Sequence, residues 1–239
     1  MPGPCQRLRL PSLATVIRTS RVDYTTSNLI RKEHRRVVVM GSARVGKTCI
    51  ISQFLYDKYI IRYRQTVEEL HRGDYNLPDG SSLTLDILDT SGAFEFPAMR
   101  TLSISTAGAF ILVFAVDDLL SWDEVERLRK EIIEARGYKV PIVVVGNKTD
   151  IEDSERKLQS ETIAAIVRED WKSGYIECSA KDNTGIVEVF KELLVQANIR
   201  YNLSPAVRRR RQSLPSYSSH TNKSVSNKFS FKRHSCTVT

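Results

Sequence analysis

Residues 41–48 read Gly41-Ser42-Ala43-Arg44-Val45-Gly46-Lys47-Thr48, and this segment carries the strongest indication of the fold. The apolar segment Arg36–Met40 precedes it and predicts a buried strand, while Lys47–Tyr59 follows with apolar residues at helical spacing. A strand, a glycine-bearing turn and a Gly-Lys-Thr helix start predict a phosphate-binding loop, because backbone N–H groups and the helix N-terminus then surround phosphate oxygens. Lys47 is expected to reach the β- and γ-phosphates, and the Thr48 hydroxyl to bind Mg²⁺.

Strand-like and helix-like segments alternate from residue 35 onward. The other predicted strands are Leu70–Leu77, Ser82–Leu88, Ala109–Val116, Val140–Val145 and Gly174–Glu177, and the other predicted helices are Ser121–Arg136, Ser160–Glu169 and Thr184–Arg200. The first two strands flank Pro78-Asp79-Gly80, a turn sequence, and therefore predict a hairpin. Ser121 followed by Glu124 predicts a capping box. The alternation predicts an α/β fold with a mostly parallel six-stranded sheet and helices on both faces, whose ligand binds beyond the carboxyl ends of the strands.

Two polar motifs follow successive predicted strands and select a base. Asn147-Lys148-Thr149-Asp150 comes after Val140–Val145, and Ser179-Ala180-Lys181 comes after Gly174–Glu177. The Asp150 carboxylate can accept hydrogen bonds from the ring N–H and the exocyclic amino group of guanine, whereas adenine offers neither donor there. A backbone N–H near Ala180 can meet the guanine oxygen. With the phosphate-binding loop, these motifs predict a site for GTP and GDP.

Over residues 35–200 the chain resembles the Ras superfamily of small GTPases, with these motifs in the same order and spacing. Leu85–Gly92, which reads LDILDTSG, and Phe96–Ile104, which reads FPAMRTLSI, are most similar to the branch that contains dexamethasone-induced Ras and Rhes. The resemblance implies a P-loop NTPase of the small G-domain type that binds GTP, GDP and Mg²⁺, hydrolyses GTP and changes conformation with the nucleotide. It also implies a monomer whose partners are effector proteins, an exchange factor and an activating protein.

The resemblance places the first switch segment around Thr66. It implies that the Thr66 hydroxyl binds Mg²⁺ and its N–H meets the γ-phosphate, that Tyr63 closes over the phosphates, and that Tyr59 packs against guanine. Surface packing is the alternative for both tyrosines. Arg64-Gln65 replaces the family's usual Asp-Pro, a charge reversal that changes which partners bind. The predicted effector surface is Gln65, Val67, Glu68 and Glu69.

In the second switch segment the resemblance implies that Asp89 holds Mg²⁺ through a water and that the Gly92 N–H faces the γ-phosphate. Ala93 stands where the family carries the glutamine that orients the attacking water. A methyl group cannot orient water, and Ala43 and Arg44 replace two glycines of the family's phosphate-binding loop. We therefore expect slow hydrolysis and a poor response to an arginine finger.

The predicted site residues fall into two sets. The residues expected to act in hydrolysis are Lys47, Thr66 and Gly92. The residues expected to bind the nucleotide are Gly41, Ser42, Ala43, Arg44, Val45, Gly46, Lys47, Thr48, Cys49, Tyr59, Tyr63, Thr66, Asp89, Gly92, Asn147, Lys148, Asp150, Ser179, Ala180 and Lys181.

The basic residues are concentrated at the two ends of the chain. Residues 1–36 carry a net charge of +6 and residues 200–239 carry +9, whereas residues 37–199 carry −7. We expect a flexible basic extension over residues 1–34, the GTP-binding domain over 35–200 and a disordered polybasic tail over 201–239. An acidic domain argues against a nucleic-acid-binding fold, and a basic tail suits an anionic membrane surface. The alternative is a solvated tail with no specific target.

The sequence ends in Cys236-Thr237-Val238-Thr239, which has the form of a prenylation signal on Cys236. A prenyl chain together with the basic residues Arg208–Arg211 and Lys232-Arg233 would supply two membrane signals. Ser213 and Ser235 follow basic residues and resemble kinase sites, where phosphate would cancel tail charge. The four cysteines show no metal-binding spacing and indicate a reducing compartment. These features predict a cytoplasmic protein at the cytoplasmic face of the plasma membrane.

Three functions are compatible with these motifs to different degrees. The first is a signalling switch that binds GTP, hydrolyses it slowly and is read by effectors. The second is an adaptor that stays GTP-bound with negligible hydrolysis, which Ala93 and Ala43 favour, although Glu95 or Arg44 could replace the missing glutamine. The third, a P-loop kinase, fits less well because the Asn147–Asp150 motif favours guanine and the sequence offers no domain for an acceptor substrate.

Overall fold

The structure is a computed structural model that describes residues 32–76, 82–92 and 97–199. Its elements are β1 (Lys32–Met40), α1 (Lys47–Tyr56), β2 (Glu68–Asn76), β3 (Ser82–Thr90), α2 (Pro97–Thr106), β4 (Ala109–Ala115), α3 (Leu119–Arg136), β5 (Ile142–Asn147), α4 (Ser160–Ala165), the π-helical turn η1 (Ile166–Asp170), β6 (Gly174–Cys178) and α5 (Ile186–Gln196). The predicted turn at 78–80, Ala93, Glu95 and Cys236 lie outside the described residues, as do residues 200–239. β1 begins before residue 35, the predicted start of the domain.

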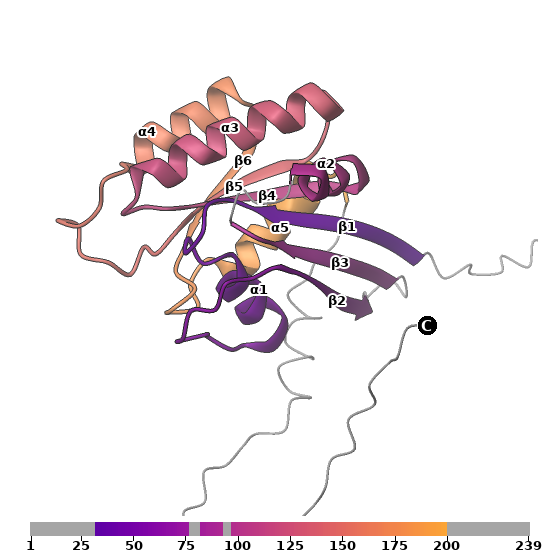
Figure 1. The fold of residues 1–239 in the computed structure, drawn as a ribbon, viewed down its shortest axis with the longest axis horizontal. Coiled ribbons are helices and arrows are strands. Elements are labelled where there is room, and N and C mark those ends of the chain that lie inside the picture. Colours follow the sequence, from indigo (N-terminus) through magenta and orange to yellow (C-terminus); the bar gives the residue numbers. More distant parts are fainter. Residues whose placement is uncertain (1–31, 77–81, 93–96, 200–239) are drawn as a thin grey trace, which may run out of the picture. The chain divides into compact units, whose positions relative to one another are not determined.

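The six strands form one sheet in the order β2-β3-β1-β4-β5-β6. β2 runs antiparallel to β3, and the other neighbouring pairs are parallel. Figure 1 shows α1 and α5 on one face of the sheet and α2, α3 and α4 on the other. The predicted α/β fold is confirmed, since parallel neighbours need crossover connections that place helices on the faces. None of the helices within the described ranges is long and apolar enough to cross a membrane.

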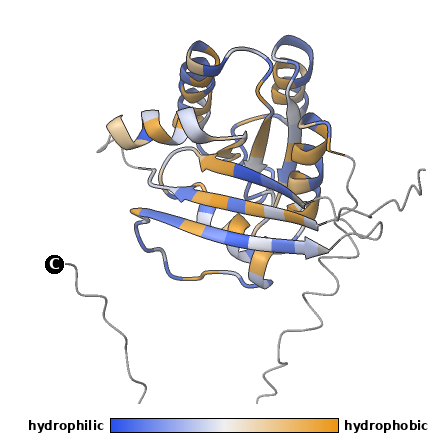
Figure 2. Ribbon diagram, turned by 90° about the vertical axis from the view of Figure 1, so that its right-hand side faces the viewer, coloured by the Kyte–Doolittle hydropathy of each residue, from blue (hydrophilic) through white to orange (hydrophobic). Residues whose placement is uncertain are grey.

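β1 lies inside the sheet and contributes to the apolar core on both faces. Val37 and Val39 belong to the cluster that contains α1 and α5, whereas Val38 and Met40 belong to the cluster that contains α3. All four side chains are at most 3% exposed. Burial on both faces explains the continuous apolar run in β1. By contrast, the strands at the β2 edge of the sheet show bands of hydrophilic and hydrophobic residues (Figure 2).

The predicted helix Ser160–Glu169 is divided into α4 and η1, α5 ends at Gln196 and not at Arg200, and α2 was not predicted. The structure corrects two further helix boundaries. α1 ends at Tyr56, earlier than predicted, because Asp57 adopts a left-handed conformation with φ of 54° and stops the helix. α5 begins at Ile186, later than predicted, because Thr184 pairs with Ser179 in an isolated antiparallel bridge. Both corrections concern loops that border the cavity described below.

The predicted capping box at Ser121 and Glu124 is wrong. α3 begins earlier, and Asp118 caps it by accepting a hydrogen bond from the Leu120 N–H at 3.1 Å. The Ser121 hydroxyl donates to the Asp118 carbonyl at 2.6 Å and accepts from the Ala115 N–H at 3.0 Å. Ser121 is fully buried, so its hydroxyl connects the end of β4 to the first turn of α3 and does not cap the helix.

Asp86 of β3 is the centre of a polar cluster that joins three strands. Its carboxylate accepts hydrogen bonds from Arg72 Nε and Nη2 at 2.7 and 3.0 Å, and His34 Nε2 lies 2.7 Å away. The hydrogen bonds from Arg72 hold the pKa of Asp86 down to about 2, with help from His34 and against the opposing effect of burial. A carboxyl whose pKa is lowered by folding stabilises the folded state wherever it is ionised.

Asp86→Asn is expected to lower the free energy of unfolding at pH 7 by about 1 kcal/mol, a modest value because Arg72 is largely exposed to solvent. The difference from wild type should persist down to about pH 4, the unfolded-state pKa, and disappear as the pH falls towards 2. Urea unfolding followed by tryptophan fluorescence at a series of pH values measures this. Glu126→Gln, on the exposed side of α3, is the control. A difference that stays constant down to pH 2 would contradict the assignment.

Candidate nucleotide-binding site

The sequence motifs meet around one cavity of about 1380 Å³. β1, β5 and β6 are parallel, so the loops that follow them emerge at the same edge of the sheet. Most of the predicted nucleotide-binding residues line this cavity. Five of them do not line it but support it through hydrogen bonds or backbone contacts to lining residues: Gly41, Ser42, Val45, Asp89 and Ser179.

Two glycines of the phosphate-binding loop allow the backbone to approach neighbouring elements closely. Gly41 has φ of 142°, and a Cβ there would lie 2.1 Å from the Val113 carbonyl oxygen of β4. Gly46 has φ of 98°, and a Cβ there would lie 2.2 Å from Asn147 Nδ2. Any side chain would force the loop away from the sheet or from the base-binding motif. The glycines therefore place the loop where its N–H groups can surround phosphate.

Lys47 is 6% exposed and is held by the loop itself. Its Nζ donates hydrogen bonds to the carbonyl oxygens of Gly41 and Ser42, both at 2.9 Å. Burial lowers the pKa of Lys47 to about 8, although the nearby Asp89 carboxylate opposes this shift. Neutral carbonyl groups do not cancel the charge of an ammonium group, so a phosphate in the cavity would favour its charged form.

Thr48, Thr66 and Asp89 bring three oxygens together beside Lys47. The Thr48 hydroxyl donates to Asp89 Oδ2 at 2.5 Å and lies 3.0 Å from the Thr66 hydroxyl. Asp89 is completely buried, its Oδ1 has no hydrogen-bond partner among the described residues, and burial raises its pKa. A buried carboxylate with an unused oxygen beside two hydroxyls suits a hard cation with oxygen ligands, such as Mg²⁺. The predicted Mg²⁺-binding residues thus fit that ion.

Asn147 connects the phosphate-binding loop to the loop that follows β6. Its Nδ2 donates to the Val45 carbonyl at 2.8 Å, and its Oδ1 accepts from the Ala180 N–H at 3.1 Å. The Cys178 thiol lies 3.5 Å from the same oxygen. Gln53 of α1 adds a second connection by donating to the Ala180 carbonyl at 2.6 Å. These bonds fix the spacing between the two ends of the cavity.

Asp150 is positioned by the residues of the Ser179–Lys181 motif. Ser179 Oγ donates to Asp150 Oδ1 at 2.8 Å, and Lys181 Nζ lies 3.2 Å from Oδ2. Burial alone would raise the pKa of Asp150, but these donors outweigh it and lower the pKa, so the carboxylate stays ionised. An ionised carboxylate at the cavity wall is an acceptor for adjacent N–H donors of a base.

The comparison with known proteins agrees with this geometry. A model of the Ras family matches residues 36–199. The chain belongs to the Ras family. GTP-binding protein Rhes from Mus musculus and from Rattus norvegicus are each 41% identical over 191 residues, which is 76% of this chain and 71% of the relative. GTP-binding protein Rhes from Homo sapiens is 40% identical over 194 residues, 77% of this chain and 73% of the relative.

The predicted Ras-superfamily membership and the similarity to Rhes are therefore confirmed. Membership in the Ras family makes the chain a Ras-like small GTP-binding protein, with GTP hydrolysis as its general reaction and with regulators and effectors as its general class of partners.

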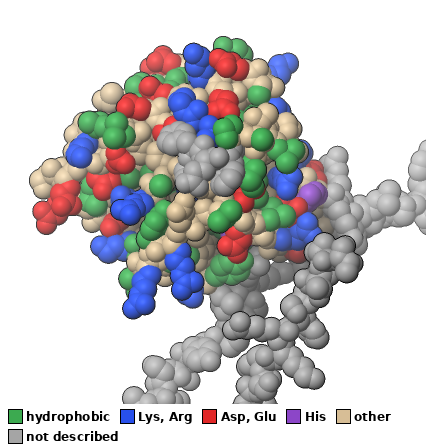
Figure 3. Space-filling model, in the orientation of Figure 1, with side chains coloured by type: hydrophobic (Ala, Val, Ile, Leu, Met, Phe, Trp, Pro, Cys, Tyr) green, Lys and Arg blue, Asp and Glu red, His purple; other side chains and the backbone are tan. Residues whose placement is uncertain are grey.

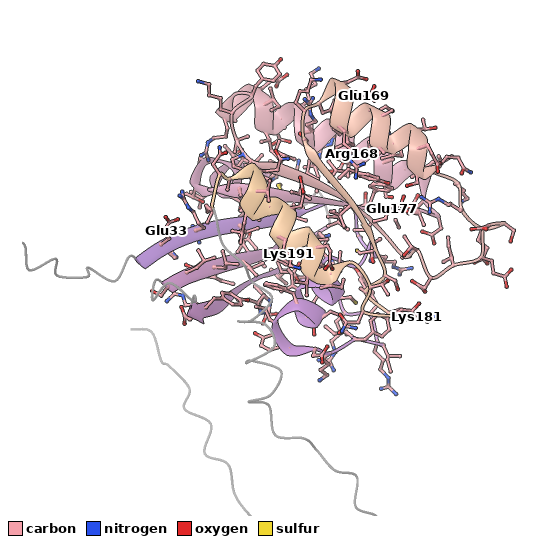
Figure 4. All side chains as sticks on the ribbon, turned by 180° about the vertical axis from the view of Figure 1, so that it is seen from behind. Glu33, Arg168, Glu169, Glu177, Lys181 and Lys191 are labelled. Carbon is pink, nitrogen blue, oxygen red and sulfur yellow. The ribbon has the colours of Figure 1, made fainter. Side chains whose placement is uncertain are left out.

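Two supporting ion pairs were missed by the sequence analysis. Lys148 has a left-handed backbone, and its Nζ lies 3.1 Å from both carboxylate oxygens of Asp117, just after β4. Glu177 of β6 forms a two-pronged ion pair with Arg156 and accepts a hydrogen bond from the Tyr175 hydroxyl at 2.6 Å. Figure 4 labels Glu177 near the end of β6 and Lys181 on the loop beyond it. Neither Asp117 nor Arg156 lies in a recognisable motif, so only their positions in the fold reveal the pairs.

The two segments predicted to act as switches border the cavity. Tyr63 is 55% exposed, and Tyr59 also lines the cavity with part of its ring exposed. A Cβ on Gly92 would lie 2.3 Å from the Ala43 nitrogen, so the second segment begins in contact with the phosphate-binding loop.

Of the predicted effector residues, Gln65, Val67 and Glu69 are exposed, whereas Glu68 is partly buried and accepts a hydrogen bond from Ser103 at 3.2 Å. Cys49 lines the cavity, and its thiol lies 3.7 Å from the Ile60 carbonyl.

Asn147→Ala is expected to lower the free energy of unfolding by about 1–3 kcal/mol even without nucleotide, because it leaves the buried Val45 carbonyl and the Ala180 N–H without their partner. Urea unfolding of the nucleotide-free protein measures the loss. Gln65→Ala, at an exposed position on a loop, is the control and should leave the stability near that of wild type. Equal stability of Asn147→Ala and wild type would show that the two loops are held in place without this side chain.

Proposed function

We propose that this Ras-like chain is a signalling switch that alternates between GTP and GDP and is read by effector proteins through residues 65–69. One observation carries the proposal: Asn147 holds the loop that bears Lys47 and the loop that bears Ala180 against a single cavity. A ligand with phosphates at one end and guanine at the other would contact both loops at once. The ionised Asp150 carboxylate supports guanine as the base.

The side chains have separate tasks in this proposal. Lys47 and the N–H groups of the phosphate-binding loop bind and orient the phosphates, and Asp150 accepts hydrogen bonds from guanine. Thr48, Thr66 and Asp89 would hold Mg²⁺, which when bound offsets phosphate charge and polarises phosphoryl oxygens. Thr66 lies in a segment without regular structure, so departure of the γ-phosphate would release that segment and remove the effector surface.

We further propose that hydrolysis is slow, so that the GTP-bound state is long-lived. Ala93 has no group that can hold the attacking water, and the side chains of Ala43 and Arg44 occupy space that an incoming arginine finger would need. Ala43 and Arg44 are both exposed at the cavity, which supports this obstruction. The alternative of an adaptor with negligible hydrolysis rests on the same residues and differs only in the rate.

Ala93→Gln is expected to raise the single-turnover rate of GTP hydrolysis by about tenfold or more, since it supplies a group that can orient water. The measurement uses the full-length protein loaded with GTP and Mg²⁺, with phosphate release as the readout. Lys139→Gln, at an exposed turn between α3 and β5, is the matched control. A wild-type rate as fast as that of ordinary Ras would contradict slow hydrolysis and indicate that Glu95 or Arg44 positions the water, whereas equally slow rates would show that Ala93 is not the cause.

Asp150→Asn is expected to weaken GDP binding by about 100-fold, because it removes the negative charge of the acceptor and places an amide NH₂ donor opposite a donor of guanine. It should also improve the binding of xanthosine diphosphate, whose 2-oxo group accepts a hydrogen bond where the 2-amino group of guanine donates one. Competition against fluorescent GDP measures both effects, and Thr149→Ala is the control within the same motif. An unchanged preference for guanine over xanthine would argue that Asp150 does not read the base.

We also propose that the tail attaches the protein to the cytoplasmic face of the plasma membrane. The net charge of +9 over residues 200–239 supports attraction to anionic lipid, and the prenylation-like ending at Cys236 supports a lipid anchor. Both features lie outside the described residues, so the support comes from the sequence. In this proposal the tail determines where the protein lies in the cell, and the GTP-binding domain acts as the switch.

A further inference from the structure

Arg44 occupies a distinctive place in the phosphate-binding loop. Its backbone is left-handed, with φ of 64°, a conformation that residues with a side chain rarely adopt. Its side chain is exposed at the cavity, and the guanidinium carbon lies 5.2 Å from the centre of the Tyr63 ring. This distance falls within the range of a cation–π interaction, about 6 Å.

Tyr63 lies in the middle of the segment that joins α1 to β2, and residues 58–67 of this segment all line the cavity. Near its beginning, the segment contacts the Cys49 thiol through the Ile60 carbonyl at 3.7 Å. Near its end, the Thr66 hydroxyl lies 3.0 Å from the Thr48 hydroxyl. The cation–π contact at Tyr63 therefore ties the middle of the segment to the phosphate-binding loop.

The segment that joins α1 to β2 is positively charged, so its contact with the cationic Arg44 needs an explanation. Lys58, Arg62 and Arg64 are exposed on it, and Figure 3 shows Lys and Arg side chains over the region where α1 connects to β2. Another cation such as Arg44 would be repelled by these charges. Residues 58–67 contain no acidic side chain, so the face of the Tyr63 ring, whose quadrupole favours a cation, is the feature of this segment that attracts Arg44.

We propose that Arg44 and Tyr63 form a latch that holds the segment closed over bound nucleotide and slows nucleotide release. The inference rests on the proposed function, because guanine nucleotide must occupy the cavity beneath the segment. Arg44 is a positioning residue in this role, since it acts through Tyr63. A glycine at position 44 would have no side chain to contact the Tyr63 ring. The arginine therefore slows nucleotide release in a way that a glycine there could not.

The test is the dissociation rate of fluorescent GDP from the full-length protein with Mg²⁺, after addition of excess unlabelled GDP. Arg44→Gln and Tyr63→Leu should each release GDP about two- to fivefold faster than wild type, which corresponds to about 0.5–1 kcal/mol. Tyr63→Phe keeps the ring and should release GDP more slowly than Tyr63→Leu. The double variant Arg44→Gln/Tyr63→Leu should be no faster than the faster single variant, because both changes remove one interaction.

Arg62→Gln removes a positive charge from the same segment without removing the ring contact, and it should change the rate little. If Arg62→Gln accelerates release as much as Arg44→Gln does, loss of attraction between charge and phosphate explains the effect and the latch is overturned. Multiplicative effects in the double variant would overturn it as well. Normal GDP binding together with either result would leave the proposed function standing. Failure of the wild type to bind fluorescent GDP would overturn the proposed function and, with it, the latch.

Discussion

The hydrogen bonds of the Asn147 side chain are the constraint on which the site depends. Asn147 ends β5, and its amide reaches the Val45 carbonyl on one side and the Ala180 N–H on the other. The phosphate-binding loop and the loops after β5 and β6 each follow a parallel strand. The sheet therefore brings these three loops to one edge but does not set the distances between them. Because Asn147 is buried, no water replaces a lost partner. One side chain therefore sets the distance between the phosphate end and the base end of the cavity.

Buried charges of opposite sign give the cavity its affinity for a charged ligand. Burial lowers the pKa of Lys47 and raises that of Asp89, so both groups are pushed towards their neutral forms. Lys47 bonds to neutral carbonyls, and Asp89 Oδ1 has no partner among the described residues. A phosphate beside Lys47 and a cation beside Asp89 would each remove an unfavourable term. The proposed ligands thus relieve an electrostatic cost that is built into the fold.

The cavity has one well-anchored wall and one exposed wall. The wall around Asn147 and Asp150 is held by buried hydrogen bonds and rests on the ends of β5 and β6. The opposite wall, between α1 and β2, has no regular structure over most of its length and is tied at a few points, one of them the contact between Arg44 and Tyr63. Segments with few buried contacts open at low free-energy cost. In the proposed function, the anchored wall would recognise the base and the exposed wall would respond to the nucleotide state.

The α/β fold, the phosphate-binding loop and the motifs expected to bind the base could be predicted from the sequence, because periodic burial and motif spacing are local properties of the chain. Only the tertiary structure shows that Asp118 caps α3 and that Ser121 is instead buried against the end of β4. It also decided that Lys148 pairs with Asp117 and that Arg44 meets Tyr63. The last two contacts join residues that are far apart in the chain, and they depend on strand order, loop conformation and side-chain direction. Those properties are set only when the sheet and its helices pack together.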